Sequence, residues 1–372
     1  MKLYFVAGEA SGDARGAELM RALRARNPRL EFFGAGGPQM KSIAGDEFLD
    51  WADEAVVGLW DVLKKYGYFK EQFDRMLVAL TRIEPHALIL IDYPGFNLRL
   101  AKAAKERLPK TKIIYYVSPQ VWAWNRGRIP KMAKFLDLML CIFPFEKPLY
   151  EESGLVTEFV GHPMLDSLAA KKIETERDRN LVALLPGSRG KEVRKIFPVM
   201  LAAARNLHRR DPNIRFEAAA ASETLAGEMR RLADGFAECD IHVGGSHGLM
   251  QRAGAGMVCS GTATLESAYF GLPMTILYKV AWLTWVVGKR LVRVRFLGMP
   301  NILAGREIVK EFLQDGGKPE LIAEEVYRLL SRRTEADRMQ RDLAAVIALL
   351  GEPGAGDRAA TAICSNLGLS PS

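Results

Sequence analysis

The sequence contains little cysteine: its 372 residues include four, which lie far apart at Cys141, Cys239, Cys259 and Cys364. No two of them have the spacing of a metal-binding or redox motif, so we expect buried, reduced thiols and a cytosolic compartment. Long apolar runs are also missing, because none reaches the ~20 residues that a membrane-spanning helix needs. A strand-like segment begins at position 2 and an acidic residue follows at position 13, so we expect no secretory leader.

Several common ligand-binding motifs are absent as well. The sequence has no Walker A loop, no helix-turn-helix, no zinc finger and no RNA-binding aromatic pattern. It has no Asp-x-Asp of the kind that holds a metal-bound nucleotide, and its five histidines lack metal-ligand spacing. No carboxylate in the sequence is placed to partner His242 or His247. We therefore expect no metal, no cofactor and no nucleic-acid partner.

Positive charge is present in excess. The 52 Lys and Arg residues outnumber the 44 Asp and Glu residues, which gives a formal net charge of +8. This excess favours anionic partners, either phosphorylated metabolites or an anionic lipid surface. A chain of this length is also too long for one ordinary hydrophobic core, so we expect two domains.

Apolar runs and amphipathic segments alternate along most of the chain. The apolar runs predict strands at 2–7, 87–92, 112–117, 137–142, 156–160, 181–185, 214–220, 255–259 and 274–279. The amphipathic segments predict helices at 14–26, 97–108, 191–209 and 222–233. Buried strands that alternate with helices are typical of a doubly wound parallel α/β sheet. A charged segment, 166–180, separates two such halves. We therefore expect two Rossmann-like domains that face each other across a cleft, followed by a helical C-terminal segment.

One turn in the second half has the features of an anion-binding site. Residues 181–193 read LVALLPGSRGKEV, an apolar strand followed by a turn at Gly187 and Ser188 and then a helix. Such a turn presents free backbone N–H groups and the positive end of a helix dipole. Arg189 adds a guanidinium group that can bind two phosphate oxygens. An ordinary turn before a helix is the alternative interpretation.

A second turn of this kind follows the apolar segment AGMVC. The sequence SGTATLE places Gly261 and Thr262 at the start of a helix and Glu266 one turn into it. A carboxylate at that position can accept hydrogen bonds from both hydroxyls of a ribose, whereas a helix-capping motif without a ligand is the alternative. Two phosphate-type turns, one with an acid at ribose distance, favour a nucleotide diphosphate site.

Three polar loops follow strands in the first half: GEASGD (8–13), IDYPGFN (91–97) and VSPQVWAW (117–124). All three should open on the same edge of the sheet. Asp92 stands at a strand end, where a partly desolvated carboxylate can act as a general base, or else caps the helix that begins near Asn97. Trp122 and Trp124 either belong to the core or line an acyl or sugar pocket.

Segment 56–73, VVGLWDVLKKYGYFKEQF, combines apolar and aromatic residues with lysines. The pattern fits an amphipathic helix that packs on the core, or a patch that contacts a membrane surface. The candidate membrane-contact residues are Val57, Leu59, Trp60, Leu63, Lys64, Lys65, Tyr66 and Phe69.

Eight motifs occur in order between positions 8 and 307: GEASGD, IDYPGFN, YVSPQVWAW, FPFEK, VGHP, LLPGSRGKEV, SGTATLE and PNILAGRE. Together they closely resemble the lipid-A-disaccharide synthases, inverting enzymes of glycosyltransferase family 19 with the GT-B fold. The resemblance implies transfer of 2,3-diacylglucosamine from UDP-2,3-diacylglucosamine to the 6-hydroxyl of 2,3-diacylglucosamine 1-phosphate (lipid X). The products would be the β-1,6-linked disaccharide 1-phosphate and UDP. A UDP-N-acetylglucosamine 2-epimerase or another UDP-sugar enzyme of the same fold is the alternative.

The resemblance also implies roles for individual residues. Asp92 would be the base for the acceptor hydroxyl, and Arg189 would bind the donor diphosphate. The substrate contacts implied by the matching motifs are Glu9, Ser11, Gly12, Asn97, Ser118, Trp122, Trp124, Gly187, Ser188, Gly261, Thr262, Glu266, Asn301 and Arg306. Some family members have a second Asp where this chain has Gly95, which leaves any supporting role at that position open.

The same resemblance implies how the chain is divided and where it works. Residues 1–168 would bind the acceptor, residues 169–350 would bind the UDP-sugar, and a helix within 351–372 would return to the first domain. The enzyme would be cytoplasmic and attached peripherally to the phospholipid surface of the inner membrane, and a homodimer is compatible with the pattern. The basic stretch 289–295 would face lipid phosphate, a second subunit or solvent.

Overall fold

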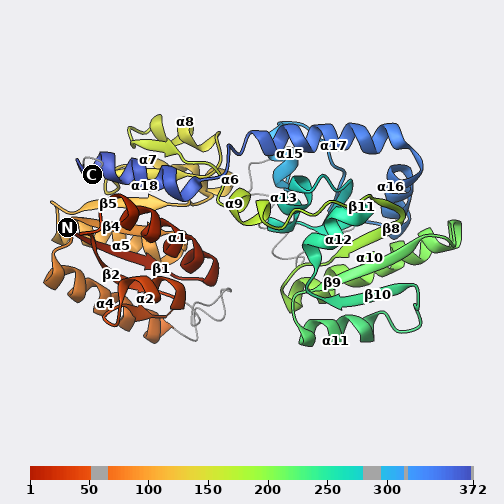
Figure 1. Cartoon of the computed structure of the whole chain (residues 1–372), viewed down its shortest axis with the longest axis horizontal. Coiled ribbons are helices and arrows are strands. Elements are labelled where there is room, and N and C mark those ends of the chain that lie inside the picture. The colour runs from red at the N-terminus through yellow and green to blue at the C-terminus, as the bar shows by residue number, and fades with distance from the viewer. Residues whose placement is uncertain (52–65, 280–294, 314–316, 370–372) are drawn as a thin grey trace. The chain divides into compact units, whose positions relative to one another are not determined.

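The computed structural model describes residues 1–51, 66–279, 295–313 and 317–369 of the chain (Figure 1). The chain forms two compact units, one of Met1–Pro163 with Leu350–Ser372 and the other of Met164–Leu349. These divisions lie close to the sequence-based boundaries after residues 168 and 350. Each unit has its own parallel sheet and its own hydrophobic core, so each can be described separately.

The first unit is built on a seven-stranded parallel sheet in the order β3-β2-β1-β4-β5-β6-β7. Its strands are β1 (Lys2–Ala7), β2 (Glu31–Gly36), β3 (Leu49–Asp50), β4 (Ala87–Ile91), β5 (Lys112–Tyr116), β6 (Leu138–Cys141) and β7 (Thr157–Phe159). Its helices are α1 (Ala10–Arg26), α2 (Pro38–Ala44), α4 (Tyr66–Ile83), α5 (Pro94–Arg107), α6 (Val121–Trp124), α7 (Ile129–Met132), α8 (Glu146–Glu151) and α18 (Ala355–Asn366), with a 3₁₀ turn at Arg126–Arg128. The strand order reverses between β1 and β4, which makes the carboxyl ends of these two strands the natural ligand-binding position.

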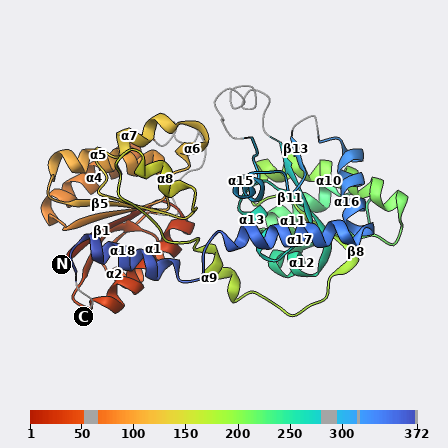
Figure 2. The same ribbon diagram turned by 90° about the horizontal axis from the view of Figure 1, so that it is seen from above.

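Helices cover both faces of this sheet, which explains its continuous apolar strands. Figure 2 shows α4 and α5 on one face and α1, α2 and α18 on the other. All five residues of β4 are buried, because alternate side chains enter the cores on the two faces. The C-terminal helix α18 packs against α1 at the start of the chain.

The acidic residue that ends the first polar loop has a structural role. Asp13 is buried on α1, and its carboxylate accepts hydrogen bonds from the backbone N–H groups of Gly37 (3.0 Å), Gln39 (3.0 Å) and Met40 (2.9 Å). These groups lie at the N-terminus of α2, where backbone donors have no partner within the helix. Asp13 therefore anchors α2, and with it the loop that follows β2, to α1.

The second unit has a six-stranded parallel sheet in the order β10-β9-β8-β11-β12-β13. The strands are β8 (Asp178–Leu185), β9 (Arg215–Ala220), β10 (Cys239–Val243), β11 (Ala253–Cys259), β12 (Met274–Tyr278) and β13 (Glu311–Leu313). The helices are α9 (Met164–Ala169), α10 (Gly190–Arg210), α11 (Glu223–Leu232), α12 (Ser246–Arg252), α13 (Thr262–Tyr269), α15 (Met299–Ala304), α16 (Pro319–Ser331) and α17 (Arg333–Ala348). Here the order reverses between β8 and β11, which pair directly.

The parallel α/β fold expected from the sequence is confirmed, and four strands that the sequence pattern did not indicate are present. β2 contains two glycines and starts with an exposed Glu31, whereas β10 carries exposed Asp240 and His242 at the edge of its sheet. β3 and β13 have only two and three residues. Such strands lack the long apolar run on which the sequence prediction depends. The four cysteines are free and buried, as expected.

Candidate active site

The polar loops of the first unit meet where the strand order reverses. The loop after β1 begins at Gly8, and a Cβ atom placed on Gly8 would lie 2.4 Å from Cδ1 of Tyr93 in the loop after β4. Glycine is therefore needed at this position for the Tyr93 ring to pack over the β1 loop. The negative charge of Glu9 raises the pKa of Tyr93 after the larger effect of burial, which places Glu9 near the same loop. Ser11 is exposed on the first turn of α1, and Gly12 is buried against Ala7.

Asp92 follows β4 directly and has an unusual backbone conformation. The φ angles of Asp92 and Tyr93 are 50° and 48°, in the left-handed region that residues other than glycine rarely adopt. Two side chains hold this turn through the Asp92 carbonyl: the Tyr115 hydroxyl donates at 2.5 Å and Asn97 Nδ2 donates at 2.8 Å. Asn97 is fully buried, so the structure places it as a support for the Asp92 turn.

The Asp92 carboxylate is partly buried and has one cationic neighbour. Its side chain is 39% exposed, and Arg15 Nη1 lies 3.5 Å from Oδ2. Partial burial raises the pKa of Asp92 above its ordinary value, while the Arg15 charge and the Tyr93 N–H group act in the opposite direction. A carboxylate with these features can accept a proton near neutral pH. The buried His162 is neutral, because burial and the Arg15 charge lower its pKa to about 3.

A buried glutamate organises the loop after β5. Glu146, at the start of α8, is fully buried, and its carboxylate accepts hydrogen bonds from Ser118 Oγ (2.6 Å), Trp122 Nε1 (2.8 Å) and the Phe143 N–H group (3.1 Å). Burial raises the pKa of Glu146 to about 7 although all three donors favour its charged form. Ser118 and Trp122, both expected at the substrate, thus point their polar atoms at this carboxylate. Backbone atoms of Trp124 belong to α6, and its side chain lies outside the described residues.

The two candidate anion-binding turns of the second unit lie at the ends of neighbouring strands. Gly187 and Ser188 follow β8, and Gly261 and Thr262 follow β11. The φ angles of Gly187 (104°) and Gly261 (151°) lie in the region that favours glycine. Helix α10 begins at Gly190 and α13 begins at Thr262, so both turns present helix N-termini at the point where the strand order reverses.

Arg189 is exposed and pairs with an acid of its own helix. Its side chain is 62% exposed, and Nη1 lies 3.2 Å from Glu192 Oε1. Glu192 Oε2 also accepts a hydrogen bond from the backbone N–H group of Arg189 at 3.3 Å. The two residues thus form a capping box at the start of α10. Arg189 is therefore held at the turn while its guanidinium group remains accessible to an anion.

Both histidines that the sequence left without a carboxylate partner have one in the structure. His247 Nε2 lies 3.6 Å from Glu266 Oε2, and His242 Nε2 lies 3.6 Å from Glu217 Oε2. The sequence expectation was wrong because each partner comes from a separate element: His247 lies on α12 and Glu266 on α13, whereas β10 and β9 carry the other pair. The ribose-binding candidate Glu266 is thus one member of a pair.

Two further candidates, Asn301 and Arg306, make contacts within the second unit. The fully buried Asn301 side chain accepts hydrogen bonds from the N–H groups of Ile308 and Val309 and donates to the Val309 carbonyl and to Glu311. Arg306 Nη2 lies 2.7 Å from Asp342 Oδ1 on α17. Asn301 holds the segment before β13, and its predicted contact with substrate stays a prediction, as does that of Arg306.

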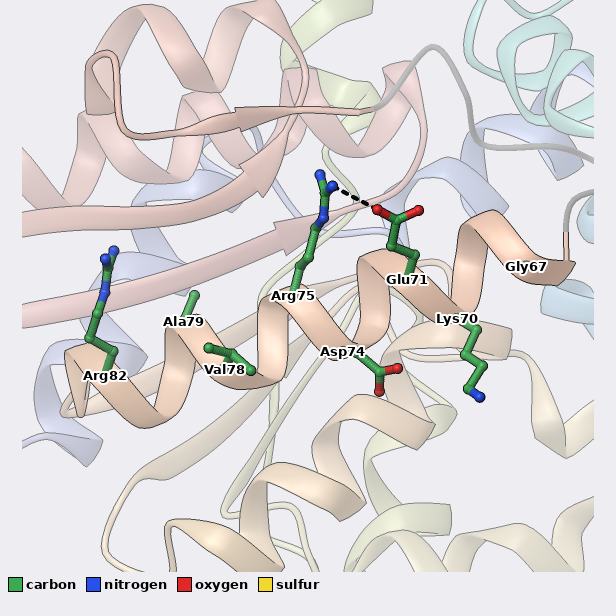
Figure 3. Close-up of a pocket in the computed structure, with 8 residues that line it drawn as sticks. All are labelled: Gly67, Lys70, Glu71, Asp74, Arg75, Val78, Ala79 and Arg82. Atoms are coloured by element: carbon green, nitrogen blue, oxygen red, sulfur yellow. Dashed lines mark ion pairs between the residues drawn. The ribbon is translucent and has the colours of Figure 1, made fainter.

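Most of the expected membrane patch lies outside the described residues, which resume at Tyr66; the side chain of Tyr66 is also outside the description. Phe69 on α4 packs edge-on against the buried Trp51, with ring centroids 6.5 Å apart. A surface hollow of about 660 Å³ runs along the exposed face of α4 (Figure 3), where Arg75 pairs with Glu71 at 2.6 Å. Acidic and basic side chains both line this hollow, and none of the candidate catalytic residues does, so we assign it no role in the reaction. The basic stretch 289–295 is described only at Arg295.

In residues 1–51, 66–279, 295–313 and 317–369, no three or more His, Cys, Asp or Glu side chains are grouped so that they could hold a metal ion. No helix in these ranges combines the length and apolarity that crossing a membrane requires.

Sequence comparison identifies the family. Residues 3–363 match the lipid-A-disaccharide synthetase family. A lipid-A-disaccharide synthase of Trichlorobacter lovleyi is 41% identical, with 98% of this chain and 97% of the relative covered, and one of Geobacter sulfurreducens is 39% identical, with 99% and 97% covered. The chain belongs to the lipid-A-disaccharide synthetase family. It is therefore a glycosyltransferase of lipid A biosynthesis.

Solved structures with low sequence identity share the fold. A UDP-GlcNAc 2-epimerase from Neisseria meningitidis, bound to UDP-GlcNAc, has a TM-score of 0.63 at 11% identity, with 99% of both chains covered. A UGT transferase from Siraitia grosvenorii, in complex with UDP, has a TM-score of 0.62 at 13% identity, with 98% of this chain and 99% of that chain covered. The GT-B-like fold expected of a lipid-A-disaccharide synthetase is thereby confirmed.

Three residues near the candidate sites were not singled out from the sequence: Arg15, Tyr115 and Glu146. His247 was considered there only as a metal ligand. Glu146 lies within the FPFEK motif, so its carboxylate was visible as part of a family pattern. Arg15 and Tyr115 occur in an ordinary helix and an ordinary buried strand, where their types carry no local signal. Their contacts with Asp92 arise because α1, β4 and β5 are brought together by the parallel sheet.

Glu146→Gln should lower the stability of the first unit. The amide NH₂ group would face hydrogen-bond donors, and an unmatched buried polar group costs about 1–3 kcal/mol. Because the folded-state pKa of about 7 lies above the unfolded value, Glu146 favours the folded state less as pH rises from about 4.5 to about 7. The difference in Tm between the wild type and E146Q should therefore be largest near pH 5 and shrink towards pH 8, as measured by differential scanning calorimetry.

Glu151→Gln is a matched control, because Glu151 lies on the same helix with its side chain 49% exposed. It should change Tm little at any pH. A Tm difference for E146Q that stays constant across this pH range would contradict the assigned ionisation of Glu146.

Proposed function

We propose that this protein transfers 2,3-diacylglucosamine from UDP-2,3-diacylglucosamine to the 6-hydroxyl of 2,3-diacylglucosamine 1-phosphate, with inversion at the anomeric carbon. The products are the β-1,6-linked disaccharide 1-phosphate and UDP. Membership of the lipid-A-disaccharide synthetase family supports the reaction class. The observation that carries the assignment within this chain is Asp92, a partly buried carboxylate with a raised pKa at the strand-order reversal of the first unit.

Asp92 serves as the general base in this proposal. Its carboxylate accepts the proton of the acceptor 6-hydroxyl as that oxygen forms a bond to the anomeric carbon. The bond from this carbon to the diphosphate oxygen breaks, and its electron pair leaves with UDP. Attack from the side opposite the leaving group gives inversion in one displacement. Tyr115 and Asn97 contribute by fixing the turn that aims the carboxylate.

The second unit binds the donor. The backbone N–H groups at Gly187, Ser188, Gly261 and Thr262 would hold the diphosphate, and Arg189 would supply the positive charge. Stabilisation of the departing oxygen by such donors is worth about 3–4 kcal/mol per donor in comparable sites. Glu266, one turn into α13, would accept hydrogen bonds from the ribose hydroxyls. No metal ion is needed if these donors meet the charge that develops on UDP.

Five of the remaining candidates fall into two groups. Glu9 and Ser11, at the start of α1 after β1, would contact the acceptor directly. Ser118, Trp122 and Asn301 would act through the loops that they hold, because their polar atoms are bonded within the protein.

Both substrates carry acyl chains, so we propose that the enzyme works at the cytoplasmic surface of the inner membrane through the residues of segment 56–73. We expect the protein to co-sediment with liposomes that contain anionic phospholipid and to be released as salt is added, because the lysines are screened. Neutral liposomes are the control. Recovery of all the protein in the supernatant at low salt would contradict membrane attachment.

The reaction is tested with UDP-2,3-diacylglucosamine and lipid X in detergent micelles, with the disaccharide 1-phosphate followed by mass spectrometry. UDP-N-acetylglucosamine alone serves as the alternative donor. Product from the acylated pair supports the proposal. Turnover of UDP-N-acetylglucosamine without disaccharide formation would overturn it in favour of an epimerase of the same fold.

Asp92→Asn should lower kcat by about 10²–10⁴-fold, because the amide cannot accept the proton, while Tm stays unchanged. An Asp92→Asn enzyme with full activity would contradict the role of Asp92 as the base.

Arg15→Gln should move the acid limb of the kcat/KM profile to higher pH, since loss of the Arg15 charge raises the pKa of Asp92 further. Arg15→Lys keeps the charge and is the matched control.

Arg189→Ala should weaken UDP binding by about tenfold or more, the usual effect of losing charge-assisted hydrogen bonds to phosphate. Calorimetric titration with UDP measures this directly. Arg194→Ala removes the same side chain one turn further along α10, where Arg194 pairs with Glu228, and should leave the affinity unchanged. Equal UDP affinity in the wild type and Arg189→Ala would refute the diphosphate role.

A further inference from the structure

His247 lies at the second position of α12, beside the carboxylate assigned to the ribose. Its Nε2 atom is 3.6 Å from Glu266 Oε2, and both side chains are 27% exposed. Its ring packs on Phe270 at the end of α13, with ring centroids 5.7 Å apart. The imidazole therefore contacts α13 at two positions one turn apart, on the side that carries Glu266.

The backbone of α12 is fixed independently of this contact. Gln251 is buried, and its amide Nε2 donates to the carbonyls of His247 (3.1 Å) and Lys171 (2.9 Å) while Oε1 accepts the Ile173 N–H group (2.7 Å). The helix is thereby tied to segment 171–173 of the same unit. His247 is thus presented to Glu266 from a supported helix and not from a free loop end.

The surroundings of His247 favour the neutral form of its imidazole. Burial lowers its pKa, the Lys171 charge lowers it further, and the Glu266 charge opposes both. Among the residues that the structure describes, Glu266 and Lys171 are the groups whose charge acts on the imidazole, and burial has the largest effect on its pKa. At 3.6 Å the two atoms are just beyond hydrogen-bond distance, so a small shift of either side chain would let a neutral imidazole whose Nε2 carries the hydrogen donate to one carboxylate oxygen of Glu266 and leave the other lone pairs free. A carboxylate on a flexible side chain gains a defined orientation from such a contact.

We propose that His247 is the positioning residue for Glu266, and that the pair sets the preference of the donor site for a ribonucleotide over a 2′-deoxyribonucleotide. The inference rests on the proposed donor site in the second unit. A ribose offers two neighbouring hydroxyl groups to the carboxylate, whereas a 2′-deoxyribose offers one. Discrimination therefore depends on the carboxylate orientation that the imidazole maintains.

The test is calorimetric titration of the full chain with UDP and with 2′-deoxy-UDP. The wild type should bind UDP about tenfold more tightly, because one hydrogen bond to a carboxylate is lost with the deoxynucleotide. In His247→Ala the preference for UDP, measured as the ratio of the Kd for 2′-deoxy-UDP to the Kd for UDP, should fall to about threefold or less. The affinity for 2′-deoxy-UDP should change by less than about twofold. His247→Gln should restore most of this preference, because its amide N–H can donate to Glu266.

A matched control is available in the same unit. His242→Ala removes a histidine that lies at the same 3.6 Å from a glutamate, but on β10 and with its side chain 57% exposed. It should leave both affinities and their ratio unchanged. Melting curves verify that each variant is folded.

The outcomes separate this inference from the donor-site proposal. If His247→Ala weakens both nucleotides equally, or neither, His247 has at most a structural role and the inference is overturned. If Arg189→Ala binds UDP as well as the wild type does, or the wild type does not bind UDP, the donor site itself fails and the inference fails with it. If Arg189→Ala weakens UDP and His247→Ala narrows the ratio, both are supported.

Discussion

The parallel pairing around one strand in each sheet is the constraint on which both candidate sites depend. β1 pairs with β2 on one side and β4 on the other, and β8 pairs with β9 and β11 in the same way. After these neighbouring parallel strands the chain continues towards opposite edges of the sheet, to β2 and β5 in one unit and to β9 and β12 in the other. The loops at their carboxyl ends therefore diverge and leave backbone groups accessible. The Tyr93 ring over Gly8, and the two candidate anion-binding turns at the ends of neighbouring strands, follow from this arrangement.

The Asp92 turn shows how a costly local conformation is maintained by its surroundings. A non-glycine residue in the left-handed region costs about 1–3 kcal/mol, and Asp92 and Tyr93 adopt it consecutively. Hydrogen bonds from Tyr115 and Asn97 to the single carbonyl of Asp92 offset this cost. The carboxylate is consequently displayed beside Arg15 instead of turning into the following helix as a cap. The same support explains why Asn97 is buried although its residue type and position suggested contact with substrate.

The parts of the fold that were predictable from sequence are those with a local signal. β4 is a run of five buried apolar residues followed by Asp92, and β8 is an apolar run followed by the turn that carries Gly187 and Arg189, so each strand and its polar loop could be located. Edge strands such as β10 mix polar with apolar residues and could not. Side-chain partners were even harder to predict from sequence. Glu146, for example, accepts hydrogen bonds from Ser118 and Trp122, which lie in a different part of the chain.

This difference has a physical basis that extends to function. A polar residue in a loop after a strand can serve the ligand or serve the loop, and the sequence pattern is the same in both cases. Burial and hydrogen-bond partners distinguish the two: Ser118, Trp122 and Asn301 have protein partners for their polar atoms. Arg189, in contrast, is 62% exposed and retains guanidinium donors beyond its contact with Glu192. Sequence pattern therefore located the loops, whereas only the structure could sort the residues within them.

The contact between Arg189 and Glu192 also bears on how tightly a diphosphate can be held. Glu192 closes the cap of α10 with the Arg189 N–H group, so its carboxylate stands next to the turn that would receive the anion. An incoming diphosphate would share the guanidinium group with this carboxylate, and it would also meet a like charge. The net gain on binding is then smaller than the full value of an undisturbed charge-assisted interaction. In the proposed reaction, which releases UDP after every turnover, the nearby Glu192 carboxylate would limit the affinity for this product, while the guanidinium group would stay in place for the charge that develops during bond cleavage.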